Sequence, residues 1–208
     1  METVGWFRKI AAYGIASPLY GLGASRNHVI GMRLVSGIAA AVLLAAGPAW
    51  FALAGVVFLV GFMLAHADDE ISRLSGNANP ATASFAFYTE VLCNSLALTG
   101  LGIGLQTGAS ALKTTALGFP APLFMGFVAA FAVAAVPLLA KRLEIIDGKP
   151  SPEFDGLPGF DGEDVTILLP IALWVGWAEG LLVLAAFGGI AFAGGIYMAH
   201  FRKYHGMA

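Results

Sequence analysis

Acidic side chains stand at the ends of two strongly apolar segments. Three consecutive acids at positions 68–70 follow an apolar run, Arg73 comes next, and Glu90 lies inside the following apolar run. Ionisable groups inside or at the edge of a membrane segment are costly, so a functional site is the default hypothesis for them. A carboxylate at Glu90 needs a basic partner, a metal or a proton. Residues 64–94 are therefore the candidate site, with a solvated loop at 68–73 as the alternative.

The composition is that of an integral membrane protein. Of 208 residues, 58% are hydrophobic and only 12% are charged, which is too apolar for an ordinary soluble domain. The net charge is −2 and no basic stripe is present, which argues against a nucleic-acid partner. The single cysteine, Cys93, cannot form an internal disulfide. We expect membrane lipids as partners and no nucleic acid.

The apolar segments predict an all-α fold with six transmembrane helices. Turn residues such as Gly47 and Pro48 separate them. Each segment approaches the roughly 20 residues that a helix needs to cross the hydrocarbon, and the fifth is the shortest. The predicted helices cover residues 28–46, 49–66, 84–105, 119–140, 165–178 and 181–200.

Glycines are frequent in these predicted helices. Small residues let two helix backbones approach closely inside a membrane. We interpret them as packing positions and not as part of a ligand site. The glycines concerned are Gly55, Gly61, Gly100, Gly102 and Gly104.

We interpret residues 1–208 as a single membrane domain. Aromatic residues beside Arg8 and Lys9 are typical of a helix that lies on the membrane surface. The predicted parts are an interfacial segment at 1–25, four helices at 26–142 that include the motif region 64–94, an acidic loop at 143–164, and two helices with a basic tail at 165–208.

The basic residues predict the orientation of this topology. All Lys and Arg residues except Lys113 fall on one side of the six predicted helices. An excess of Lys and Arg marks the cytoplasmic side of a membrane protein. Both termini, the motif region and the acidic loop are therefore expected to be cytoplasmic.

Three stretches resemble the CDP-alcohol phosphatidyltransferases: Ser25–Val29, Asp68–Gly76 and Phe85–Asn94. The resemblance covers residues 15–105, and the remainder is similar only in its six-helix architecture. Enzymes of this family carry D-x2-D-G-x2-A-R-x8-G-x3-D-x3-D across their second and third helices. Their four aspartates hold two divalent metals that bind the CDP diphosphate, and the last aspartate is thought to activate the alcohol that displaces CMP. Acids three or four residues apart share a helix face, so two facing helices can hold hard cations.

In a first register, Arg73 aligns with the arginine of the family motif and Asp68 with its second aspartate. Ala65, Thr89 and Cys93 then stand where the other three aspartates are expected. Hard divalent cations prefer carboxylate oxygens, and a thiol is a poor replacement. In this register the resemblance implies that a retained CDP-binding site would use Asp68, Ser72 and Arg73.

A second register differs by one residue. It places His66 and Asp69 on one helix and Glu90 and Asn94 on the other, each pair at the spacing of the family motif. Potential metal ligands over both registers are Asp68, Asp69, Glu90 and Asn94. A one-residue shift rotates a helical side chain by about 100°, so both registers cannot face one cleft. We favour the first register because residues 71–76 fit the family best in that frame.

The substituted positions favour a catalytically degenerate protein that serves as a lipid-binding or structural subunit of a membrane complex. The alternative is an active phosphotransferase of phospholipid biosynthesis, which moves a phosphatidyl or phosphoalcohol group from a CDP-linked donor and uses Mg²⁺ or Mn²⁺. A third possibility is an unrelated transporter with Glu90 as its ion site. Without activity we expect no cofactor, and the expected partners are membrane lipids together with other membrane-protein subunits or a second copy of the chain.

Overall fold

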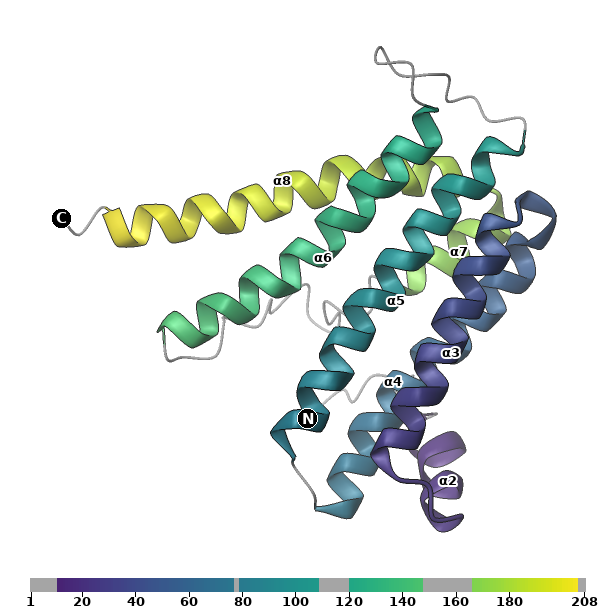
Figure 1. Ribbon diagram of the computed structural model, residues 1–208, viewed down its shortest axis with the longest axis vertical. Helices are drawn as coiled ribbons and strands as arrows, with labels where there is room; N and C mark the ends of the chain where they lie inside the picture. Colours follow the sequence, from purple (N-terminus) through teal and green to yellow (C-terminus); the bar gives the residue numbers. More distant parts are fainter. Residues whose placement is uncertain (1–10, 77–78, 109–119, 148–165, 206–208) are drawn as a thin grey trace.

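The computed structural model describes residues 11–76, 79–108, 120–147 and 166–205, and within these ranges the chain forms helices and no strand. Six longer helices follow a short N-terminal helical segment (Figure 1). Their bounds are α3 Arg26–Ala45, α4 Phe51–Ser75, α5 Pro80–Gln106, α6 Ala121–Asp147, α7 Leu168–Val175 and α8 Ala178–His205.

The helices α3, α4 and α5 form a bundle that carries the polar residues of interest. In this bundle α3 packs against both α4 and α5 (Figure 1). From there α5 packs against α6 and α6 against α8, and these last two helices extend away from the bundle toward the C-terminus. The short helix α7 lies against α4. The bundle therefore positions the candidate site, and α6 to α8 lie beside it.

The protein is an all-α membrane protein. Among the described residues, four helical stretches are long and apolar enough to span a membrane: Arg26–Ala45, Pro48–Ser75, Ala121–Arg142 and Ala178–Gly195. Helix α5, with 27 residues, is long enough to cross but is not among these four. The predicted fifth span contains only the eight-residue helix α7, about 12 Å long at 1.5 Å per residue. This length is less than half of the roughly 30 Å of the hydrocarbon core.

Four helices, α4, α5, α6 and α8, extend by four or more residues beyond a predicted end. Helix α4 continues past His66 and ends where Gly76 adopts a left-handed conformation at φ 60°, so the acids at 68–70 belong to a helix and not to a loop. Helix α6 continues past Arg142 to Asp147. The predicted acidic loop 143–164 therefore begins with helical residues, and positions 148–164 lie outside the described residues.

The N-terminal segment packs against the end of α4 that carries the acids. The helical turn at Ala11–Ala16 contacts α4, and α2, Ser17–Gly21, packs against that turn. Ala16 is buried in a small apolar cluster with Val29 of α3 and Ile71 of α4. Residues 1–10 of the predicted interfacial helix lie outside the described residues. The described turns thus stabilise the end of the bundle at which α3 begins.

Glycines bring α3 and α5 into close contact. A Cβ atom at Gly100 would overlap the carbonyl oxygen of Ala41, and one at Gly104 would overlap that of Leu44. On the other side of α5, the backbones of Gly102 and Gly126 meet. The packing interpretation of these glycines is therefore confirmed. Close approach of α3 and α5 also places their polar side chains within reach of one another.

Candidate functional site

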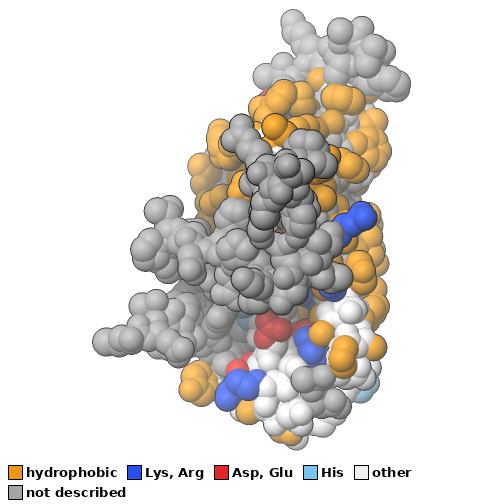
Figure 2. Space-filling view, turned by 90° about the vertical axis from the view of Figure 1, so that its left-hand side faces the viewer, with side chains coloured by type: hydrophobic (Ala, Val, Ile, Leu, Met, Phe, Trp, Pro, Cys, Tyr) orange, Lys and Arg blue, Asp and Glu red, His pale blue; other side chains and the backbone are white. Residues whose placement is uncertain are grey.

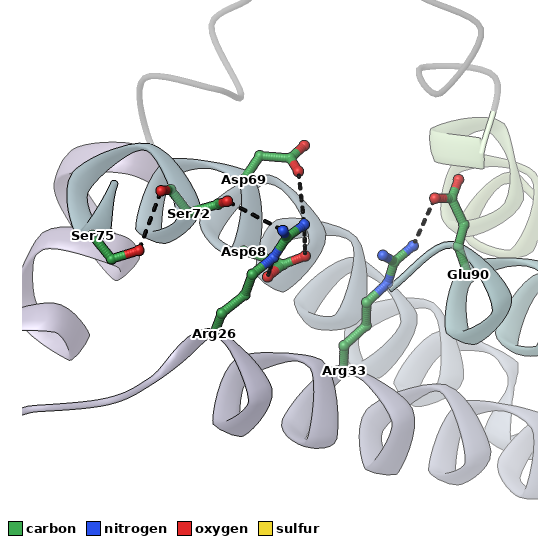
Figure 3. A network of polar contacts seen from close by, with 7 residues as sticks. All are labelled: Arg26, Arg33, Asp68, Asp69, Ser72, Ser75 and Glu90. Atoms are coloured by element: carbon green, nitrogen blue, oxygen red, sulfur yellow. Dashed lines mark hydrogen bonds and ion pairs between the residues drawn. The ribbon is translucent and has the colours of Figure 1, made fainter. Parts of the chain in front are cut away.

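A salt bridge between α3 and α4 forms the centre of the candidate site (Figure 3). The guanidinium of Arg26 contacts both oxygens of Asp68: Nε donates to Oδ1 at 2.8 Å and Nη2 donates to Oδ2 at 3.2 Å. The Asp68 side chain is 2% exposed and that of Arg26 is 15% exposed. A bidentate guanidinium–carboxylate pair is the strong form of a charged hydrogen bond, and burial limits competition by water. Each oxygen of Asp68 therefore has a hydrogen-bond donor.

Two further oxygens of α4 lie near the same guanidinium. Arg26 Nη1 donates to the hydroxyl of Ser72 at 3.1 Å, and Nη2 lies 3.8 Å from Oδ1 of Asp69. Asp68 and Ser72 are four residues apart and share a helix face, so one cation can reach both. Asp69 extends from the adjacent position and is 71% exposed. Arg26 thus neutralises a group of α4 oxygens and not one carboxylate alone.

A second ion pair links α3 to α5. Arg33 Nη2 lies 3.4 Å from Oε2 of Glu90, whose side chain is 33% exposed (Figure 3). Arg26 and Arg33 lie two helical turns apart, so both guanidiniums project from one side of α3. One helix therefore supplies the counter-charge for carboxylates on two neighbouring helices.

A cavity of about 30 Å³ adjoins the Arg33–Glu90 pair. Ala65 of α4 and Asn94 of α5 line it together with these two charged residues, and Thr166, just before α7, contributes to its wall. A volume of this size holds about one or two water molecules. The cavity can keep the ion pair hydrated, but it is too small for a nucleotide.

The three substituted motif positions are buried or partly buried. Thr89 and Cys93 are buried, and Cys93 fits against Gly37, where its Sγ lies 3.9 Å from the carbonyl oxygen of Arg33. Ala65 lines the cavity. Cys93 and Ala65 lie between α3, α4 and α5, where the resemblance leads us to expect metal-binding carboxylates. Here they serve helix packing.

Arg73 lies apart from the candidate site. Its side chain is 72% exposed and pairs with Glu70, three residues earlier on the same helix. The structure therefore brings together Asp68, Asp69 and Ser72 with Arg26, and Glu90 and Asn94 with Arg33, but Arg73 contacts neither group. The two motif residues that survive in the favoured register, Asp68 and Arg73, do not meet.

Sequence reasoning missed the roles of Arg26 and Arg33. It placed Arg26 in one of the family-like stretches and both arginines on the same membrane side as Asp68, but it paired neither with an acid. Their spacing of seven positions puts them on one helix face, and the second helix leads back to the same end of the first. The spacing of the two arginines and the return of the second helix therefore indicated that they could pair with the acids. These features did not indicate which acid pairs with which arginine.

Polar and apolar surfaces separate along the bundle. On the face shown in Figure 2, the charged side chains lie in the middle and lower parts, and the upper part is apolar. The lower part is where α2 and the start of α3 lie (Figure 1). The candidate site therefore belongs to one end of a bundle whose other end is suited to lipid.

The donor groups do not fit a pair of divalent metals. Among the described residues, no group of three or more His, Cys, Asp or Glu side chains could hold a metal ion. Asp68 is engaged by Arg26, and Glu90 is paired with Arg33 on another helix. Two divalent cations need several free carboxylates between facing helices. At this end of the bundle, arginine side chains lie between the helices instead of free carboxylates.

No family model matches this sequence, and no curated protein matches it. Inferences about function therefore rest on the residues, their contacts and the three stretches described above.

Proposed function

We propose that the chain is a CDP-alcohol phosphatidyltransferase-like membrane protein that has lost catalysis and serves as a lipid-binding or structural subunit of a membrane complex. The observation that carries this proposal is the pairing of Asp68 with Arg26 and of Glu90 with Arg33. Carboxylates that would bind metal in an enzyme are held by arginines of α3. This arrangement supports a bundle that is complete without a cofactor.

Charge balance supports the same conclusion. The carboxylates of Asp68, Asp69 and Glu90 face the guanidiniums of Arg26 and Arg33, so the formal charge of the cluster is about −1. Two divalent cations would raise it to about +3, an unfavourable charge at the edge of a low-dielectric region. A site with four carboxylates and no arginine would stay near neutral with the same two metals.

The proposal includes the six-helix topology with both termini and the motif region in the cytoplasm. Four apolar helices support part of it, and α5 is long enough to add a fifth span, whereas α7 alone covers only part of the membrane. The N-terminal turns, the start of α3 and the acidic end of α4 lie at one end of the bundle, in keeping with a shared membrane side. Membrane lipids are the proposed ligands, and other membrane-protein subunits or a second copy are the proposed partners.

Ligand-dependent stability of the wild-type protein tests the loss of catalysis. The chain is placed in nanodiscs, and its melting temperature is measured with CMP or a CDP-lipid in Mg²⁺, in Mn²⁺ or in chelator. A ligand at about 100 times its dissociation constant stabilises the folded state by about 2.7 kcal/mol, which is readily measured. We expect no nucleotide-dependent shift and no release of CMP. A shift that disappears with chelator, together with turnover, would instead establish the active phosphotransferase.

The proposed role as a subunit has its own test. Purification under mild conditions from native membranes, followed by mass spectrometry of proteins and lipids, should recover a stoichiometric partner or a retained lipid. An Arg73→Gln variant is the matched control, because Arg73 is exposed and lies outside the network. It should retain the same partner. A chain that is monomeric and free of retained lipid would contradict the proposal.

A further inference from the structure

Two basic side chains at the end of the apolar part of α6 differ from the arginines of α3 and α4. Arg26, Arg33 and Arg73 each pair with a carboxylate. In the part of the chain that the structure describes, no ion pair includes Lys141 or Arg142. The apolar span of α6 ends at Arg142, so both charges lie where the hydrocarbon gives way to lipid headgroups. This boundary therefore carries positive charge that the described carboxylates do not neutralise.

Two aromatic rings of α5 hold the Lys141 ammonium beside that helix. Its Nζ lies 4.2 Å from the ring centre of Phe87 and 5.2 Å from that of Tyr88. The two rings meet edge to face, with their centres 5.4 Å apart. The electron-rich face of a ring attracts a cation but carries no net charge, so the ammonium keeps its charge and its remaining N–H donors. Lys141 is thus held in place and can still bind an anion.

Exposed apolar side chains continue from these charges into the span. On α5, Leu92 lies one turn further into the membrane than Tyr88, and the two side chains are 47% and 55% exposed. On α6, Leu138 lies one turn further in than Arg142 and is 41% exposed. Residues four apart share a helix face, and α5 packs directly against α6. The two cations therefore stand above a surface that is suited to acyl chains.

We propose that Lys141, Arg142 and Tyr88 form a binding site for the headgroup of an anionic phospholipid, whose acyl chains lie on the exposed faces of α5 and α6. The inference rests on the proposed lipid-binding role and topology, and it names the class of lipid and its place on the protein. A lipid phosphate accepts charge-assisted hydrogen bonds from an ammonium and a guanidinium. Basic side chains at a membrane surface favour anionic lipids, because the choline group of a zwitterionic lipid is repelled by the same cations.

The test compares lipid binding by the wild type and by a double variant with Lys141→Gln and Arg142→Gln. The full chain in detergent is titrated with phosphatidylglycerol or with phosphatidylcholine, and native mass spectrometry measures the lipid-bound fraction. We expect the wild type to prefer phosphatidylglycerol. The double variant should bind that lipid about 25-fold more weakly, at about fivefold for each cation removed beside an anionic headgroup. Its affinity for phosphatidylcholine should change much less.

Two further variants locate the lipid. Arg73→Gln is the matched control, because it removes one exposed positive charge from α4 and leaves α5 and α6 intact. It should bind phosphatidylglycerol as the wild type does. Tyr88→Leu keeps an apolar surface but removes one ring from beside Lys141, and it should weaken binding by about two- to fivefold. If the double variant fails to fold, Lys141→Gln and Arg142→Gln are measured singly, and each should lose about fivefold.

Each other outcome also decides the inference. A wild type without preference for phosphatidylglycerol, a double variant that keeps the preference, or an equal loss in Arg73→Gln would overturn it. Displacement of the lipid by soluble glycerol phosphate at the same concentration would show a phosphate site that needs no acyl chains, which would also overturn it. The proposed function fails separately, if the wild type turns over a CDP-linked substrate. A wild type that lacks lipid selectivity but retains a partner subunit would refute this inference alone.

Discussion

Replacing Asp68 should destabilise the protein far more than replacing Glu70, although the two acids lie on one helix two residues apart. In Asp68→Ala, the guanidinium of Arg26, which is mostly buried, loses both carboxylate oxygens. Breaking a buried ion pair by removing one partner costs about 3–5 kcal/mol, because an uncompensated charge remains buried. For a chain of this size, this range corresponds to a fall of about 6–20 °C in melting temperature. Glu70→Ala breaks a pair whose arginine is exposed, and it should change the melting temperature little.

Unfolding in nanodiscs, followed by circular dichroism, provides the comparison. The double variant with Arg26→Met and Asp68→Leu adds a second test, because removing both charges should restore part of the stability that either single change removes. Similar melting temperatures for Asp68→Ala and Glu70→Ala would refute the reasoning. Such a result would mean that water reaches Asp68 and that the salt bridge contributes no more than a surface pair.

Three smaller predictions concern the other contacts of the bundle. Glu90→Gln should cost about 1 kcal/mol in an unfolding measurement, less than Asp68→Ala, because the Arg33–Glu90 pair is longer and Glu90 is partly exposed. Gly104→Ala should destabilise the protein by about 1–3 kcal/mol, because its methyl group would overlap a carbonyl oxygen of α3. Gly31 has open space around it, so Gly31→Ala should be neutral or slightly stabilising. Equal melting temperatures for the two variants would contradict this packing. Trp174→Phe should cost about 1 kcal/mol, because the indole N–H donates to a carbonyl oxygen of α4 at 3.0 Å, and an unchanged stability would show that this bond is dispensable.

The sequence alone was sufficient to predict the class of the fold. Long apolar segments and scarce charge require helices in a membrane, because every backbone group in lipid must be hydrogen-bonded within the chain. Turn residues predicted most helix starts to within a few positions, as for α3, which begins at Arg26 directly after Ser25. Helix ends were less accurate where polar residues continue a helix past the apolar run, as Asp68 to Ser75 do in α4.

The acidic members of the candidate site were also visible in the sequence. Asp68, Asp69 and Glu90 stand out because charge is rare in apolar surroundings. The glycines of α5 could be assigned to packing for a comparably simple reason, since only small residues allow two helices to approach closely. These inferences depend on the type of residue and on local spacing, and neither requires knowledge of which helices are neighbours.

Only the tertiary structure decided how the charges are paired. Arg26 and Asp68 are far apart along the chain, and they meet because the hairpin of α3 and α4 returns the acidic end of α4 to the start of α3. Arg73 aligns with a motif arginine, yet it extends from the exposed side of α4 and pairs with Glu70. A rotation of about 100° per residue separates a buried position from an exposed one, and packing against neighbouring helices fixes that rotation. Sequence patterns therefore identified which groups could carry a function, and helix packing determined that arginines engage the acids.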